Sequence, residues 1–169
     1  MWAFCVHSLF REYGWRFLWR VAVRHPVKTA RAVLDSGALD FSGNMTTMST
    51  EVTAQSLEGA SSIIGVGFCL KQTSPTCMSG RANHDCYYLE HLLHCETPDV
   101  PICCQQCAVR DIGTMTLKAD AAFYIMTSAQ DILFDLFLPA LNEGKFSSGL
   151  FLLCRYSLRP FAVGLLVSG

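Results

Sequence analysis

Charged side chains are scarce in this chain of 169 residues. They make up 16% of the residues, whereas soluble domains average about 25%. The net charge is −1, which excludes a generally basic nucleic-acid-binding protein, so no nucleic-acid partner is expected. Because apolar residues reach 51%, we expect a partner protein, a second copy of the chain or a membrane surface to cover part of the molecule.

Long apolar runs are also lacking. The best candidate, residues 149–169, contains Arg155 and Arg159, which argues against a transmembrane helix. Arginines likewise interrupt every apolar stretch of residues 1–25, so no secretory signal is expected. These absences favour a cytoplasmic protein whose thiols stay reduced.

Familiar catalytic motifs are missing as well. The chain has no Ser–His–Asp order, no H-E-x-x-H and no Walker sequence. The sequence therefore names no reaction, and whether the protein is an enzyme stays open.

Basic residues gather near the N-terminus. Residues 1–35 hold six basic and two acidic side chains, and positions 16, 20, 24 and 28 are spaced by four. This spacing predicts a basic, aromatic helical arm over 1–35, interrupted at Pro26 and followed by a short helix that Gly37 stops. The arm's aromatic residues either pack on the rest of the protein, lie on a membrane surface through residues 1–25, or enter a groove of a partner protein. Residues 36–62 are polar and predict a connecting segment.

Three apolar, β-branched or aromatic runs predict strands at 63–69, 121–127 and 149–154. Helical patterns follow the last two runs, at 129–142 with Ser128 as N-cap and Gly144 as terminator, and from Ser157, as N-cap, to about 167. Alternation of strand and helix predicts an α/β domain over 63–169: a small parallel sheet with crossover helices, and a cysteine-rich insertion after the first strand.

Parallel strands carry their ligands at their carboxyl ends. Cys69 ends the first predicted strand, Thr127 and Ser128 end the second, and Cys154 ends the third. These four residues are therefore expected at one edge of the sheet, where Thr127 and Ser128 also form a weak candidate site for an anion at a helix N-terminus. A buried structural cysteine is the alternative interpretation of Cys154.

Cysteine is the unusual residue of this sequence. Seven of its nine cysteines lie between positions 69 and 107, where an even distribution would place about two. Cys104 and Cys107 form a C-x-x-C step, in which two thiolates can hold one ion. The other spacings fit no zinc-finger pattern, which favours an iron–sulfur cluster over zinc. The preferred ligands are Cys69, Cys77, Cys86, Cys104 and Cys107, with Cys103 and Cys154 in reserve.

Residues 85–95 are expected to form a helix that begins close to Cys86. A thiol at a helix N-terminus tends to have a lowered pKa, which favours the thiolate form. His91 and Cys95, four residues apart, could hold zinc, although solvent-exposed histidines are the preferred interpretation.

The second half of the chain, about 63–160, resembles an uncharacterised family of cysteine-rich α/β proteins from archaea and anaerobic bacteria that is presumed to bind metal. The similarity lies in the segment Cys104-Gln-Gln-Cys-Ala-Val-Arg-Asp-Ile-Gly113, in the strand and small-residue turn 123–128, in the strand that leads to Cys154 and in the pair Cys69 and Cys77. The resemblance implies the fold and metal binding rather than a reaction.

Two functions are therefore expected. The first is an iron–sulfur protein with a role in electron transfer, cluster handling or thiol redox chemistry. The second is a non-catalytic adaptor that zinc stabilises and that docks on a partner protein or a membrane surface.

Overall fold

The computed structural model describes residues 14–40, 57–95 and 99–168. Within these ranges the chain forms two compact units that alternate along the sequence. The sheet unit contains residues 57–127 and 146–153, and the helical unit contains residues 14–40, 128–145 and 154–168. A boundary between the units therefore falls at each end of the segment 128–145. The sequence analysis placed its segment boundaries after residues 35 and 62 instead.

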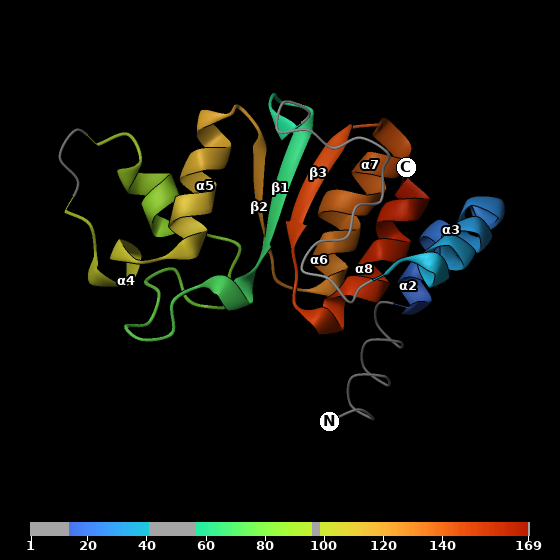
Figure 1. Ribbon diagram of the computed structural model, residues 1–169, viewed down its shortest axis with the longest axis horizontal. Helices are drawn as coiled ribbons and strands as arrows, with labels where there is room; N and C mark the ends of the chain where they lie inside the picture. Colours follow the sequence, from blue (N-terminus) through green and yellow to red (C-terminus); the bar gives the residue numbers. More distant parts are fainter. Residues whose placement is uncertain (1–13, 41–56, 96–98, 169) are drawn as a thin grey trace. The chain divides into compact units, whose positions relative to one another are not determined.

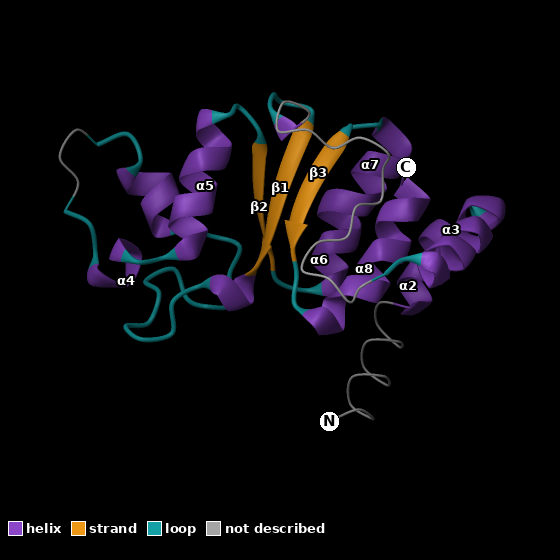
Figure 2. Cartoon of the chain, in the orientation of Figure 1, coloured by secondary structure: helices purple, strands orange, loops and turns teal. Residues whose placement is uncertain are grey.

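The sheet unit is built on three parallel strands, β1 (Ser62–Gly67), β2 (Ala122–Met126) and β3 (Ser148–Leu152), in the order β2-β1-β3 (Figures 1 and 2). Ile64 of the central strand is paired with Phe123 on one side and Leu150 on the other. The ring of Phe151 packs against the backbone of Gly65 in the central strand. A Cβ at Gly65 would lie 2.5 Å from that ring, so only glycine fits there without a shift of the ring. The small parallel sheet and the α/β class are confirmed.

The segment between β1 and β2 carries short helices and the cysteine-rich insertion. These helices are η4 (Phe68–Leu70), η5 (Tyr88–Leu92), α4 (Ile102–Gln105) and α5 (Ala108–Lys118). Figure 1 shows α5 beside β2. The helix η5 lies against α5 at Gly113, where an added Cβ would overlap the side chain of Leu89. A glycine in mid-helix thus allows η5, which begins two residues after Cys86, to approach α5 closely.

The helical unit contains α2 (Trp15–Phe17), η2 (Leu18–Ala22), α3 (Pro26–Ala38), α6 (Ala129–Ile132), η6 (Leu133–Phe137), α7 (Leu138–Glu143) and α8 (Arg155–Ser168). Its interior includes Leu133 and Phe137, whose ring lies 5.2 Å from that of Phe161. Ser128 caps α6 by accepting the backbone N–H of Asp131, as expected. None of the helices in the described ranges is long and apolar enough to cross a bilayer.

Several expected element ends are wrong by a few residues. The strands end at Gly67 and Leu152, so Cys69 and Cys154 follow their strands instead of ending them. The helix α3 continues through Gly37 to Ala38, because an isolated glycine lowers helix stability without ending a helix. Ser157 lies inside α8 and not at its N-cap. The apolar positions expected within 1–13, and residues 41–56 of the expected connecting segment 36–62, fall outside the described residues.

Candidate metal centre

Four cysteines from two parts of the insertion are buried in the sheet unit. Cys86 precedes η5, Cys103 and Cys104 belong to α4, and Cys107 is the N-cap residue of α5. Each is at most 8% exposed. The backbone positions this group, since the N–H of Cys107 donates to the carbonyl of Cys104 and the N–H of Asp111 donates to that of Cys107. We call Cys86, Cys103, Cys104 and Cys107 the thiol cluster.

The thiols of this cluster influence one another. The sulfur atoms of Cys103 and Cys104 are 3.8 Å apart. The pKa of the Cys104 thiol is raised from 9.0 to about 12, mainly by burial, with smaller contributions from the hydrogen bond with Cys103 and from like charge on Cys103, Cys86 and Cys107. Negative charge on a neighbouring thiol therefore makes ionisation of Cys104 harder.

Cys86 combines two opposing influences. Hydrogen bonds from the backbone N–H groups of Tyr88 and Leu89 lower its pKa, as expected for a helix N-terminus. Burial is the larger effect and raises the pKa of Cys86, and like charge on Cys107 and Cys77 adds to that rise. The expectation of a thiolate favoured by the helix N-terminus is thus wrong for the metal-free protein, because desolvation outweighs the helix.

Apolar side chains surround two thiols of the cluster. Cys86 and Cys107 share a core with Val66, Val109 and Ile125. Phe68, Tyr88, Leu89, Ile112, Phe123 and Leu152 pack around that core. Such an environment excludes water and raises the strength of any bond between a thiolate and a cation.

A buried lysine organises the loop that leads to Cys86. Lys71 is 2% exposed. Its Nζ donates hydrogen bonds to three backbone carbonyls, those of Gly80 (3.0 Å), Asn83 (2.6 Å) and Asp85 (2.7 Å). These bonds match the three N–H donors of an ammonium group. Since Asp85 directly precedes Cys86, Lys71 anchors the backbone at the entrance to the thiol cluster.

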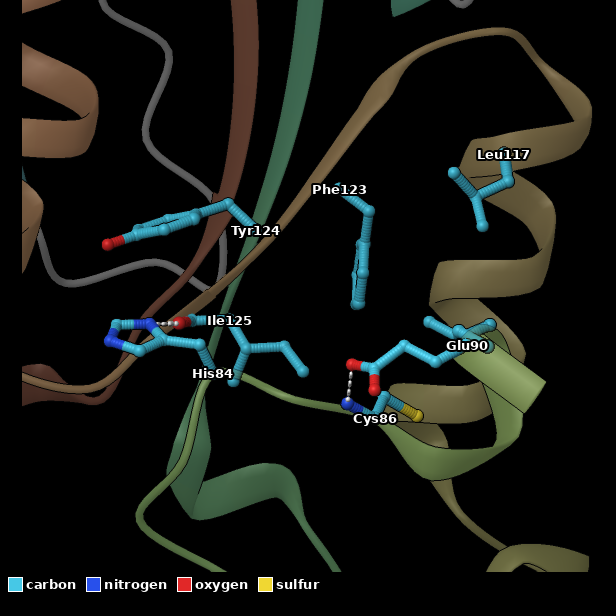
Figure 3. Close-up of a pocket in the computed structure, with 8 residues that line it drawn as sticks. His84, Cys86, Glu90, Leu117, Phe123, Tyr124 and Ile125 are labelled. Carbon is cyan, nitrogen blue, oxygen red and sulfur yellow. Dashed lines mark hydrogen bonds between the residues drawn. The ribbon is translucent and has the colours of Figure 1, made fainter. Parts of the chain in front are cut away.

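A pocket of about 330 Å³ opens beside Cys86. Figure 3 shows the ring of Phe123 pointing into it between Ile125 and Glu90. Apolar residues form much of its lining, and Glu90 binds the backbone N–H of Cys86 at 3.0 Å. The remaining lining residues are His84, Leu89, Leu117 and Tyr124. Cys86 therefore belongs both to the thiol cluster and to the wall of a pocket that a small molecule could enter.

The other expected ligands are less buried than the thiol cluster. Cys77 is half-buried and close enough to Cys86 to affect its pKa. Cys69 is exposed, and its sulfur lies 3.1 Å from the position of a Cβ on Gly67, at the end of β1. Cys154 is exposed in the helical unit, with its sulfur 3.2 Å from the Ser157 hydroxyl, so the alternative of a buried structural cysteine is wrong.

The expected anion site at the second strand is occupied by internal hydrogen bonds. The hydroxyl of Thr127 lies 3.0 Å from Nε2 of His84. The hydroxyl of Ser128 donates to the carboxylate of Asp131 at 2.6 Å and accepts its backbone N–H. Because that carboxylate already lies at the start of α6, the arrangement disfavours a further anion.

Exposed residues of the insertion do not complete a coordination shell. His91 and His94 are exposed, and the thiol of Cys95 donates to the backbone carbonyl of His91. Within the described residues, no three or more His, Cys, Asp or Glu side chains are arranged as a metal-coordinating group. A metal would therefore have to draw the thiols of the cluster together.

Comparison of the chain with protein-family models, with curated proteins and with solved structures found no match. The resemblance to a cysteine-rich family stays a prediction.

The sequence analysis missed the role of Lys71 and the hydrogen-bond partners of His84. A lysine directly after an apolar strand and a turn could have drawn attention to Lys71, but its three carbonyl partners belong to a loop without any pattern. The ring of His84 bonds to the carbonyl of Ile125 at 3.0 Å (Figure 3), a contact across 41 positions that no local motif reveals.

Proposed function

We propose that the thiol cluster of Cys86, Cys103, Cys104 and Cys107 binds a thiolate-preferring metal, first of all an iron–sulfur cluster. One observation carries the proposal: four buried thiols from segments at least 17 residues apart lie close together, and the pKa of Cys104 is raised by burial and by like charge on the other three. A bound cation would reverse that effect, because its positive charge stabilises each thiolate.

Core packing alone explains these residues poorly. A single buried cysteine behaves as a small apolar side chain, but four such thiols in one place fill a core less completely than larger aliphatic residues do. Cys103 and Cys104 are also adjacent in sequence and both buried on a helix of four residues. Metal binding gives a reason for this local excess of sulfur.

The surroundings favour an iron–sulfur cluster. Iron–sulfur clusters accept cysteines from separate segments, and burial among apolar residues sets their potential. The core of Val66, Val109 and Ile125 supplies such burial, and Cys77, next to Cys86, is available as a further ligand. The cluster would supply one-electron chemistry, while the pocket beside Cys86 would admit a small reactant.

Zinc is the second candidate. Four thiolates suit a structural zinc site, which would hold the loop at Cys86 against α4 and α5 without any catalysis. Such a protein would be an adaptor. Both candidates place the protein in a reducing compartment, for which we propose the cytoplasm; the absence of a disulfide among the eight described cysteines supports this.

The test is an absorption spectrum of protein purified without oxygen, with iron, zinc and sulfide assayed on the same sample. We expect a brown protein with a broad absorption band at about 400 nm and with iron and sulfide in similar amounts. A colourless protein with about one zinc per chain would support the adaptor instead. Protein that takes up neither metal, even after reconstitution, would refute the proposal.

Matched cysteine variants locate the site. Cys107→Ser is expected to abolish metal uptake, and Cys107→Ala serves as a second variant in case the buried hydroxyl disturbs folding. Cys95→Ser and Cys154→Ser change exposed thiols and should retain the full metal content. Full occupancy in both Cys107 variants would show that the metal is bound elsewhere.

A further inference from the structure

The helices α2 and η2 present an apolar face to solvent. The large residues at positions spaced by three and four are exposed: Trp15 by 59%, Leu18 by 44%, Trp19 by 53% and Val23 by 53%. The indoles of Trp15 and Trp19 contact each other edge to face, with centroids 5.6 Å apart. The same segment buries Val21 to 2% exposure. The exposed face is therefore a second apolar face on a segment that already contributes to the core.

Positive charge lies next to this face. Arg16, Arg20 and Arg24 recur every four residues and are all exposed. The guanidinium of Arg20 lies over the ring of Phe134 at 5.3 Å. Helical periodicity places these three arginines next to Trp15 and Trp19, along one side of the exposed apolar face.

The helix α3, coloured blue to cyan in Figure 1, continues the pattern. Its side chains Val27 and Leu34 are 80% and 77% exposed, while Ala32 is buried. Lys28 and Arg31 are exposed between them. No acidic residue occurs from position 14 to position 34, so two successive helices combine exposed apolar side chains with charge of one sign only.

We infer that residues 14–34 dock on an anionic phospholipid bilayer. The charge pattern favours an anionic partner, since five cations without an acidic residue suit the headgroups of anionic lipids. Two exposed indoles on one helix face suit the boundary between headgroups and acyl chains, where tryptophan is enriched. Basic residues flanking an exposed apolar face are the pattern of helices that lie in the plane of a membrane.

Tryptophan fluorescence tests this inference directly. The three tryptophans are Trp2, Trp15 and Trp19, so the intrinsic tryptophan emission reports on the first 19 residues of the chain alone. On vesicles of phosphatidylcholine with a third of phosphatidylglycerol, we expect a blue shift and co-sedimentation of the protein. Vesicles of pure phosphatidylcholine should bind it at least tenfold more weakly, and added salt should release it.

Paired variants separate the specific face from general charge. Arg16→Gln with Arg24→Gln should weaken vesicle binding by on the order of tenfold or more. The control, Arg81→Gln with Lys118→Gln, removes the same charge from exposed positions of the sheet unit and should bind as the unchanged protein does. Trp15→Ser with Trp19→Ser should abolish insertion while circular dichroism stays unchanged.

Three results would overturn the inference. Equal binding to charged and uncharged vesicles would remove the electrostatic argument, and equal losses in both charge variants would remove the specific face. A dimer in lipid-free solution that Trp15→Ser with Trp19→Ser dissociates would assign the face to a second copy of the chain. The vesicle assay is independent of metal, so its outcome is distinct from that of the proposed metal binding.

Discussion

Replacing Lys71 by methionine tests the buried anchor of the loop before Cys86. Methionine keeps an unbranched side chain of similar length but has no N–H donor. The carbonyls of Gly80, Asn83 and Asp85 would each lose a hydrogen bond from Nζ. A hydrogen bond to a charged group contributes about 1.5–3 kcal/mol. Methionine offsets part of the loss of the three bonds, because burying an apolar side chain costs less desolvation free energy than burying an ammonium group. We therefore expect Lys71→Met to lower the free energy of unfolding by about 2–4 kcal/mol.

Urea unfolding of the reduced, metal-free protein, followed by circular dichroism, measures this loss. With a slope of about 2 kcal/mol/M, the midpoint should fall by about 1–2 M. Lys71→Arg should also be less stable, because a planar guanidinium cannot aim three donors at three converging carbonyls. The exposed Lys118 is the control, and Lys118→Met should cost less than about 1 kcal/mol. A Lys71→Met midpoint equal to that of Lys118→Met would refute the anchor.

Three further predictions concern packing and the thiols. Gly113→Ala should lower the free energy of unfolding by about 1–3 kcal/mol because the new methyl group overlaps Leu89. Gly37→Ala, in open space on α3, should raise the free energy of unfolding by about 0.5–1 kcal/mol. Urea midpoints of the opposite order would contradict both predictions. The raised pKa values of Cys86 and Cys104 mean that the metal-free native state keeps protons that the unfolded chain loses above pH 9. Thermal stability should therefore fall as the pH rises above 9, by up to about 1.4 kcal/mol per pH unit for Cys104 as far as pH 12. Cys86 acts in the same direction, and the fall should be less steep in Cys104→Ala. In native metal-free protein, a thiol reagent should modify the three exposed cysteines of the described ranges quickly and the thiol cluster only on unfolding. Mass spectrometry counts the modified cysteines, and rapid modification of all of them would contradict the burial of the cluster.

The sheet could be predicted from the sequence because its signals are local. The run Ile63-Ile64-Gly65-Val66 combines β-branching with a length that suits a buried strand, and the alternation of strands with helices leaves parallel pairing as the natural arrangement. The ends of the strands were less predictable. Cys69 continues the apolar run of β1, yet its backbone turns into η4, since apolar character alone does not distinguish a strand from a tight turn.

The thiol cluster could be predicted only in part. The C-x-x-C step and the position of Cys86 before a helix pointed to Cys86, Cys104 and Cys107, which the structure brings together. The place of Cys103 in the cluster depends on the short helix α4, which buries two adjacent cysteines at once, and α4 is too short to leave a periodic pattern. The division into two units could not be predicted, because the helical unit draws on three separate segments of the chain.

The raised pKa of Cys104 would make the proposed metal binding selective. Raising the pKa of Cys104 from 9.0 to about 12 adds about 4 kcal/mol to the cost of its thiolate. Structural zinc releases about 10–16 kcal/mol on binding to thiolates and imidazoles near pH 7, which exceeds this extra cost. Magnesium and calcium prefer oxygen ligands and gain little from sulfur, so they cannot offset it. The burial that raises the pKa of Cys104 would thus also restrict the proposed site to metals that bind thiolates strongly.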